Sequence, residues 1–122
     1  MTATSAPGIP RGIRNNNPLN IKRSNITWEG KSAIQPDAVF ERFDSPHYGI
    51  RAAARNLLTY YRRDKLDTIQ EIIPKWAPAS DDNNTTVYID FVAKKMGVQP
   101  DTELNLDDEE VLTALVTAMM GM

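Results

Sequence analysis

The spacing of apolar residues changes its period near residue 45. From Pro46 onward, apolar side chains recur at steps of three and four, which is the period of one face of a helix. Proline suits the first helical position, so a helix of about four turns is predicted from Pro46. Its apolar face comprises Ile50, Ala53, Ala54, Leu57, Leu58 and Tyr61. Its polar face carries Arg51, Arg55 and Arg62.

The first of three shorter helices is predicted by the capping box Thr68-Ile-Gln-Glu71. In such a box, the Thr and Glu side chains bond reciprocally to backbone amides at the helix start. We expect this helix to end near Pro74 or Pro78, with Trp76 just past its end. Its apolar face is Ile69, Ile72 and Ile73.

Polar starts and apolar stripes mark the other two helices. Residues 80–86 form a polar loop, in which Asp81 or Asp82 is the expected cap of the next helix. The stripe of that helix is Tyr88, Phe91, Val92 and Met96, and Gly97 ends it. A second capping box, Asp107-Asp-Glu-Glu110, begins a terminal helix whose inward residues are Val111, Leu112, Leu115, Val116 and Met119.

Residues 19–43 follow a different pattern. Three short β-prone pieces, 19–21, 26–28 and 39–43, are separated by Gly30 and Pro36. They predict a small antiparallel sheet or an irregular lobe. With the helices that follow, the expected fold class is α+β, mainly α, with a short N-terminal β lobe and about four helices.

Length and composition indicate one folded domain. A chain of 122 residues buries one sizeable core and is too short for two. We assign residues 11–122 to that domain and residues 1–10 to a flexible arm, which lacks the basic start and apolar segment of a secretion signal. Apolar runs of about 18 residues are absent from the sequence, so membrane insertion is not expected.

Cysteine and histidine usage narrows the chemistry. The sequence has no cysteine and a single histidine, His47. Thiol catalysis, disulfides and thiolate metal sites are therefore excluded, and a histidine metal cluster or a Ser/His triad is implausible. A metal site built from cysteine or histidine is therefore not expected. His47 itself, in the first turn of a predicted helix, is more often a surface or packing residue than a proton shuttle.

Charge is distributed unevenly along the chain. Residues 1–65 carry 11 Lys and Arg against 5 Asp and Glu, a net of +6, whereas residues 66–122 carry 3 against 11, a net of −8. Such a dipole suits head-to-tail docking or a cleft between lobes, although a solvated surface is the commoner explanation. Because the basic half has no dense Lys/Arg helix, nucleic acid is not an expected partner.

Asparagine-rich loops and tryptophans are the candidate binding residues. Asn amides donate and accept hydrogen bonds and tolerate left-handed backbone, so they serve either to bind sugar hydroxyls or to close turns. Each tryptophan either packs in the core or stacks on a sugar ring. The candidates are Asn15, Asn16, Asn17, Asn20, Trp28, Trp76, Asn83 and Asn84.

Glycoside chemistry would need a protonated acid beside the scissile oxygen. Glu71 and Glu110 stand at capping positions, and the remaining carboxylates lie in exposed runs or turns, among them Glu29. Two candidates stay open: Glu41, which alternates with Phe40 and Phe43, and Asp82, beside the 83–84 asparagines. Neither stands out from the sequence alone.

The order of these motifs resembles the virion-associated lytic proteins of tailed and related bacteriophages, from about residue 11 to residue 119. The shared blocks are Arg11-Gly-Ile-Arg-Asn-Asn-Asn-Pro18, Asn20-Ile21, Trp28-x-Gly30, Phe40-x-x-Phe43-x-Ser45-Pro46, Trp76-Ala-Pro78 and Asn83-Asn-Thr85-x-x-Tyr88. The resemblance implies a small lysozyme-like domain related to lytic murein transglycosylases. Its implied substrate is the glycan strand of peptidoglycan, with Tyr88 added to the binding residues and no cofactor.

Three departures from the family pattern bear on activity. Leu19 stands where the family usually has glycine, and Asp82 where it usually has glutamate. The family's terminal helix commonly runs on into a Glu-x-Gly element, which this sequence lacks. Under a circularly permuted lysozyme-like fold, the printed chain would end short of its acid.

Two functions therefore stay open. The first is a murein glycosidase of the phage virion that acts in the host periplasm or cell wall, with Asp82 or Glu41 as general acid. The second is a virion structural protein that contacts other virion proteins and retains the fold without the chemistry.

Overall fold

The amphipathic helix expected from Pro46 is α2, Pro46–Asp64, the longest element in the computed structural model of the chain. The structure describes residues 10–81 and 83–121. The predicted arm, apart from Pro10, lies outside that range. The chain divides into two units, Met1–Ala53 and Ala54–Met122, called here the N-terminal unit and the C-terminal unit. Each is described by itself.

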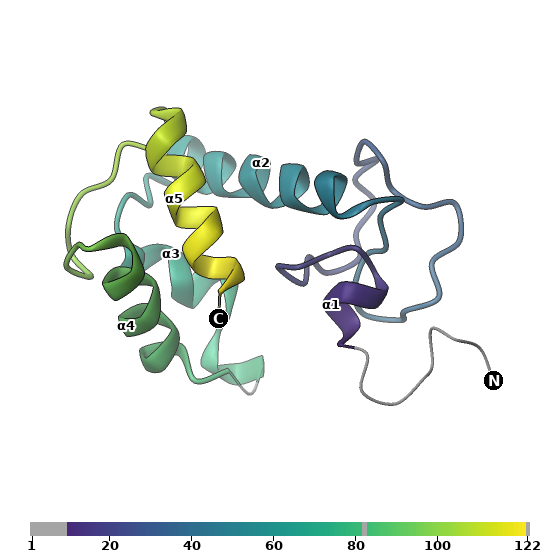
Figure 1. Cartoon of the computed structure of the whole chain (residues 1–122), viewed down its shortest axis with the longest axis horizontal. Helices are drawn as coiled ribbons and strands as arrows, with labels where there is room; N and C mark the ends of the chain where they lie inside the picture. Colours follow the sequence, from purple (N-terminus) through teal and green to yellow (C-terminus); the bar gives the residue numbers. More distant parts are fainter. Residues whose placement is uncertain (1–9, 82, 122) are drawn as a thin grey trace. The chain divides into compact units, whose positions relative to one another are not determined.

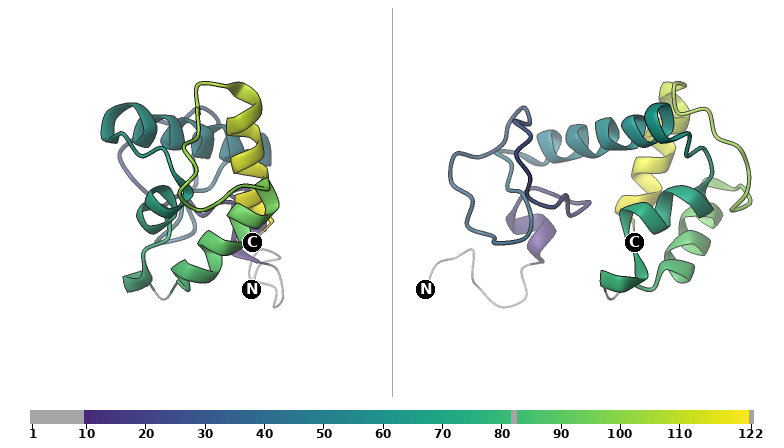
Figure 2. Two further views of the ribbon diagram at one scale, coloured as in Figure 1. Left: turned by 90° about the vertical axis from the view of Figure 1, so that its left-hand side faces the viewer. Right: turned by 180° about the vertical axis from the view of Figure 1, so that it is seen from behind.

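The C-terminal unit contains the last turns of α2 and three further α-helices. These are α3 (Ile69–Trp76), α4 (Thr85–Met96) and α5 (Glu109–Met120), with a short 3-10 helix, η2 (Ala79–Asp81), between α3 and α4. Helix α4 packs against both α3 and α5 (Figures 1 and 2). The mainly α prediction is confirmed. Every helix in the described part of the chain is too short or too polar to cross a membrane.

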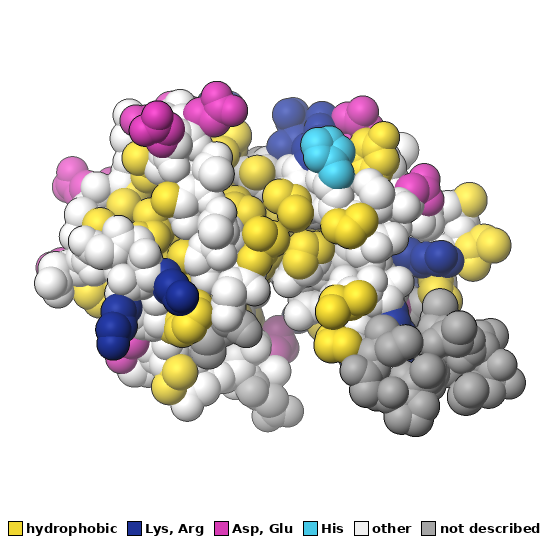
Figure 3. All heavy atoms as spheres, in the orientation of Figure 1, with side chains coloured by type: hydrophobic (Ala, Val, Ile, Leu, Met, Phe, Trp, Pro, Cys, Tyr) yellow, Lys and Arg dark blue, Asp and Glu magenta, His cyan; other side chains and the backbone are white. Residues whose placement is uncertain are grey.

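Apolar side chains at helical spacing form the core of the C-terminal unit. Fully or almost fully buried are Leu57, Ile69, Ile72, Ile73, Val92, Leu104, Leu106, Leu115, Val116 and Met119. The stripes predicted for α3 and α5 account for most of this core. Acidic side chains gather where α5 begins, at its first turn (Figure 3), and there they are favoured by the helix dipole.

The helix ends differ from the predictions in three places. Thr68 is the N-cap of α3, but its side chain makes no capping hydrogen bond: its hydroxyl donates to the Glu71 carboxylate at 2.8 Å, so the predicted reciprocal capping box does not form. Helix α3 continues through Pro74 and ends at Trp76, which is therefore its last residue rather than a residue beyond it. Proline removes one backbone donor and crowds the preceding turn, yet the buried face of α3 keeps this short helix in place. At α4, the N-cap is Asn84, whose side chain accepts from the Val87 amide at 3.2 Å, so neither Asp81 nor Asp82 holds that position.

The end of α4 and the start of α5 follow the sequence signals. Gly97 ends α4 in the left-handed conformation at φ 72°, which glycine adopts without a steric penalty. Asp108 caps α5 by accepting from the Glu110 amide at 2.9 Å. Both boundaries lie within one residue of the predicted positions.

The N-terminal unit is built from loops rather than strands. Its described residues contain a one-turn helix, α1 (Arg11–Arg14), and two isolated antiparallel bridges, Lys22 with Phe40 and Lys31 with Phe43. The short β-prone pieces do pair, but each pairing lasts for only one bridge. The expected lysozyme-like β lobe is therefore not seen, and the irregular-lobe alternative describes this region.

Two glycines allow segments of the N-terminal unit to approach closely. A Cβ on Gly30, which has φ 75°, would lie 2.0 Å from the ring of Tyr48. A Cβ on Gly49 would lie 2.2 Å from the carbonyl oxygen of Asn16. The first turn of α2 thus lies directly against the 28–31 turn and the asparagine loop.

Candidate functional site

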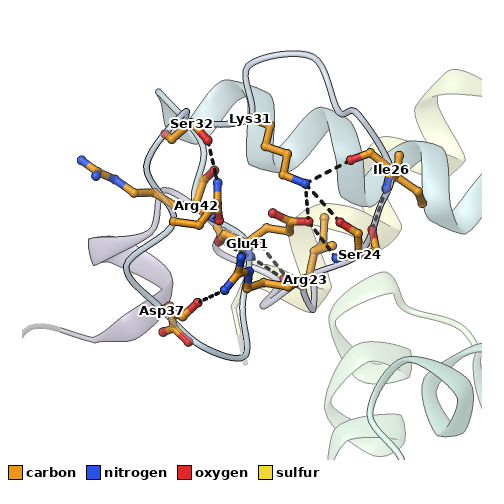
Figure 4. A network of polar contacts seen from close by, with 11 residues as sticks. Arg23, Ser24, Ile26, Lys31, Ser32, Asp37, Glu41 and Arg42 are labelled. Atoms are coloured by element: carbon orange, nitrogen blue, oxygen red, sulfur yellow. Dashed lines mark hydrogen bonds and ion pairs between the residues drawn. The ribbon is translucent and has the colours of Figure 1, made fainter.

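Glu41 is the candidate acid that the structure describes, and its side chain is fully buried in the N-terminal unit. One carboxylate oxygen, Oε1, accepts from the Ser24 amide at 3.0 Å and lies 3.3 Å from the Lys31 ammonium. Figure 4 shows the carboxylate pointing toward these two groups. Oε2 is equally buried and has no hydrogen-bond partner among the described residues.

Lys31 joins the carboxylate to the loop that covers it. Its ammonium also donates to the carbonyl oxygens of Ser24 at 3.1 Å and Ile26 at 3.3 Å (Figure 4). The side chain keeps a quarter of its surface exposed, so one end of the ion pair reaches solvent. The bonds of Lys31 and of the Ser24 amide therefore hold residues 24–31 against the Glu41 side chain.

Burying a charge is expensive unless it is paired and hydrogen-bonded. The Lys31 ammonium and the Ser24 amide compensate one oxygen of Glu41, while the other is left without a donor. Such an unpaired buried oxygen departs from the usual satisfaction of buried polar atoms and calls for a functional or structural reason. Trp28 Nε1 and Arg42 Nε of the same unit are also buried without a hydrogen-bond partner among the described residues, but Oε2 of Glu41 is the carboxylate oxygen of this group.

The three consecutive asparagines hold the backbone of the N-terminal unit. Asn17 is fully buried: its amide donates to the carbonyls of Ile21 at 2.9 Å and Glu41 at 3.0 Å, and its oxygen accepts from the Ile21 amide at 2.9 Å. Asn16, at φ 51°, donates to the carbonyl of Phe43 at 2.9 Å. These bonds fit the alternative in which the asparagines close turns of the backbone. A sugar could contact Asn17 only if this loop opened.

Asp37, which the sequence reasoning did not single out, organises a second polar cluster. It accepts from Arg11 Nε at 2.9 Å, Asn15 Nδ2 at 3.1 Å and the backbone amides of Val39 and Phe40. The Arg11 hydrogen bonds, with help from these amides, hold the pKa of Asp37 far below its usual range. The Arg11 guanidinium also lies 4.5 Å from the centre of the Phe40 ring, a cation–π contact.

The two tryptophans lie in different units. Trp28, in the N-terminal unit, is partly buried, and its indole Nε1 is enclosed without a hydrogen-bond partner in the part of the chain that is described. Trp76, in the C-terminal unit, packs edge-on against Tyr60 with ring centres 6.2 Å apart. Trp76 is partly buried and its ring packs on another aromatic side chain, whereas the Trp28 indole N–H has no hydrogen-bond partner among the described residues.

The remaining candidates lie in the C-terminal unit. Asn83 is exposed and donates to the carbonyl of Pro78 at 3.0 Å, and Asn84 is the cap of α4. Tyr88 donates to the carbonyl of Met119 at 3.3 Å, and burial raises its pKa to about 12. Asp82 lies outside the described residues.

The structure thus brings the 15–17 asparagines and Glu41 together in one network of the N-terminal unit. Asn20, which is exposed at φ 52°, closes the turn at the edge of that network. Lys31 belongs to it as well, and the Asp37 cluster is joined to it through the Asn15 amide; sequence reasoning missed both residues. A signal existed for Asp37, since an Asp after Pro36 often accepts from amides two residues on; none existed for Lys31.

Comparison with known proteins gives one informative relationship. None of the known protein-family models matches the chain. The chain is 44% identical over 125 aligned positions to Protein P5 of Pseudoalteromonas phage PM2, an alignment that covers 100% of this chain and 76% of that protein.

Proposed function

We propose a function from one premise: the chain belongs to the same family of phage proteins as Protein P5 of Pseudoalteromonas phage PM2. We infer that it is a component of a phage virion directed at the host cell wall. Its activity would be cleavage of the glycan strand of peptidoglycan, with Glu41 as the general acid. The motif resemblance supports the substrate, and the relative supports the phage origin.

The observation that carries this proposal is the environment of Glu41. A glycosidase acid donates its proton to the oxygen of the bond that breaks, and such acids are typically held away from bulk water. Glu41 is fully buried, and its Oε2 has no partner among the described residues. That oxygen is the atom that would take up the proton once the ion pair with Lys31 is broken.

Catalysis would require residues 24–31 to move, because a general acid must come within hydrogen-bond reach of its target. The Ser24 and Lys31 contacts are the ones that would break. In the transglycosylase reaction, Glu41 gives its proton to the leaving oxygen as the C1–O bond breaks. The sugar's own 6-hydroxyl then bonds to C1 and returns a proton to Glu41, so no water is consumed.

A second candidate function is a virion structural protein without catalysis. The Lys31 ion pair and the Asn17 network favour it, because both use Glu41 to hold the N-terminal unit together. In this alternative, Oε2 has no catalytic role, and the chain serves murein binding or contacts with other virion proteins.

Incubation of the purified chain with isolated peptidoglycan separates the two candidates. Soluble products are identified by mass spectrometry for the wild type, Glu41→Gln and Asp82→Asn. Glu103→Gln is the matched control, since it makes the same chemical change at an exposed carboxylate. Release of 1,6-anhydro muropeptides by the wild type and the control, but not by Glu41→Gln, is the expected result.

Other results would change the assigned acid or reaction, or would reject the proposal. Loss of products in Asp82→Asn alone would make Asp82 the acid, and hydrated reducing ends would indicate a hydrolase. Sedimentation of the wild type with murein without any product would establish the structural alternative. If the wild type neither releases products nor sediments with murein, murein is rejected as the target.

A further inference from the structure

The C-terminal unit contains a pocket that is separate from the Glu41 network. It has a volume of about 330 Å³ and is lined by Tyr61, Arg62, Lys65, Asp67 and Asp107. Its walls are the last turn of α2, the α2–α3 connection and the loop before α5. This volume lies at the lower end of the range found for small-molecule sites, which suits a ligand of amino-acid size.

Lys65 is the most informative residue of this pocket. It follows the last residue of α2 with φ 60°, in the left-handed region, where a side chain on Cβ is strained. The other non-glycine residues described with positive φ are both asparagines, which tolerate this backbone. Strain of this kind tends to gather at functional sites.

No stabilising contact explains a lysine at this position. Within residues 10–81 and 83–121, its ammonium makes no ion pair or side-chain hydrogen bond, and the side chain is exposed. Gly97, at the end of α4, shows the residue that such a helix end favours. Lys65 therefore brings an available positive charge to the pocket at a cost in backbone strain.

The opposite wall of the pocket is held in position by contacts to α2. Tyr61 donates to Asn105 at 3.3 Å, and Arg62 donates through both Nε and Nη2 to a single oxygen, Oδ1, of Asp107. Arg62 Nη1 and Asp107 Oδ2 take no part in that pair. Each side chain is more than half exposed, so these atoms remain accessible to a ligand.

We propose that this pocket binds the zwitterionic head of an amino acid. The carboxylate of the ligand lies against Lys65 and Arg62, and its ammonium lies against Asp67 and Asp107. Two cations and two anions in one pocket match a ligand that carries both charges better than a plain anion or a plain amine. In peptidoglycan, the diamino acid of the stem peptide presents such a head. The choice of peptidoglycan as the source of the ligand rests on the proposed function, whereas the argument for the pocket does not.

The test is a titration of the full chain by NMR with meso-diaminopimelic acid. Pimelate, which has the same carbon chain and carboxylates but no amine, and cadaverine, which has the amines but no carboxylate, are the matched ligands. Lys65→Gly removes the charge and relieves the strained backbone, so this variant is expected to fold at least as stably as the wild type. Lys94→Ala removes one positive charge from an exposed site on α4 and is the control.

Saturable binding of diaminopimelic acid, weakened about tenfold in Lys65→Gly and unchanged in Lys94→Ala, is the expected result. Equal binding of pimelate, equal binding by Lys65→Gly, or no saturable shift would each overturn the proposal. A final arm uses a purified muropeptide. If the free amino acid binds and the muropeptide does not, the pocket stands and the stem-peptide source is rejected, whatever the outcome of the cleavage assay.

Discussion

The two units of the chain use opposite means to form a core. Among the described residues, four of the five buried polar or charged side chains belong to the N-terminal unit, namely Asn15, Asn17, Ser32 and Glu41. The C-terminal unit contributes only Thr68 to that group and buries mostly aliphatic side chains instead. The N-terminal unit therefore depends on directional bonds, and the C-terminal unit on burial of apolar area.

This difference matters for function because directional networks fail differently from apolar cores. Apolar burial is roughly proportional to area and tolerates repacking. A buried polar network loses much more when one partner is removed, because the other is left unsatisfied. Such networks can also switch between arrangements, as opening of residues 24–31 over Glu41 would require.

Breaking an ion pair in each unit gives the largest expected contrast. Lys31→Ala leaves the Glu41 charge buried without its cation and is expected to cost about 3–5 kcal/mol. Arg62→Ala breaks an exposed pair with Asp107 and should cost at most about 1 kcal/mol. Chemical denaturation measures both. The double variant Lys31→Met/Glu41→Leu should recover most of the loss, and a loss as large as that of Lys31→Ala would mean that the ion pair is not the cause.

A second contrast compares the buried polar residues themselves. Asn17→Ala orphans the Ile21 amide and two carbonyls, so we expect a loss of about 2–3 kcal/mol. Thr68→Ala removes one hydroxyl that donates to Glu71 at 2.8 Å and should cost about 1 kcal/mol. Hydrogen exchange read by mass spectrometry localises each effect. Equal losses would contradict the view that the N-terminal unit depends more on polar bonds.

Acid pH should weaken the N-terminal unit through Asp37. Its folded pKa lies below the unfolded value of about 3.9, so its contribution is complete above that pH and is lost as the pH falls below it. Asp37→Asn removes this dependence and should cost about 1–2 kcal/mol at neutral pH. Thermal unfolding of both chains from pH 6 to acid measures it. A stability difference that stays constant down to the lowest pH would show that Asp37 is not the group responsible.

The smallest expected effects lie at two helix ends of the C-terminal unit. Lys65→Gly relieves a left-handed backbone and should stabilise the chain by about 0.5–1 kcal/mol. Gly97→Ala introduces the same strain at the end of α4, where no neighbouring atom crowds the added methyl group, and should cost about 1 kcal/mol. Melting temperatures of the two variants should shift in opposite directions; a shift in the same direction would exclude strain as the shared cause.

The sequence was sufficient to predict the helices of the C-terminal unit, because their signals are local. The i, i+3, i+4 stripes, the Gly97 end of α4 and the aspartate cap of α5 lie within one or two turns of the residues that they order. The N-terminal unit depends on contacts across the chain, such as Asn17 with the Glu41 carbonyl. Residue spacing does not encode such pairings, so the sequence leaves a small sheet and an irregular lobe open, and only the structure shows that this region is an irregular network of loops.

The candidate site was predictable only in part for the same reason. Glu41 was one of two acids left open, yet its burial and its pairing with Lys31 depend on how residues 24–31 fold back. Lys65 was not singled out, because its significance comes from a backbone angle. The charge of a side chain is visible in a sequence, whereas the strain and the missing partner beside it are not.

The close approach at Gly30 and Gly49 sets a limit on how the chain can vary. The smallest possible side chain, a methyl group, would collide with Tyr48 at one position and with the Asn16 carbonyl at the other. A saturation library selected only for folded protein should therefore retain glycine at both positions. Scored once for folding without any ligand and once for activity or binding, such a library would distinguish residues needed for shape from residues needed for function. The folding score and the function score should differ most at Glu41 and Lys65.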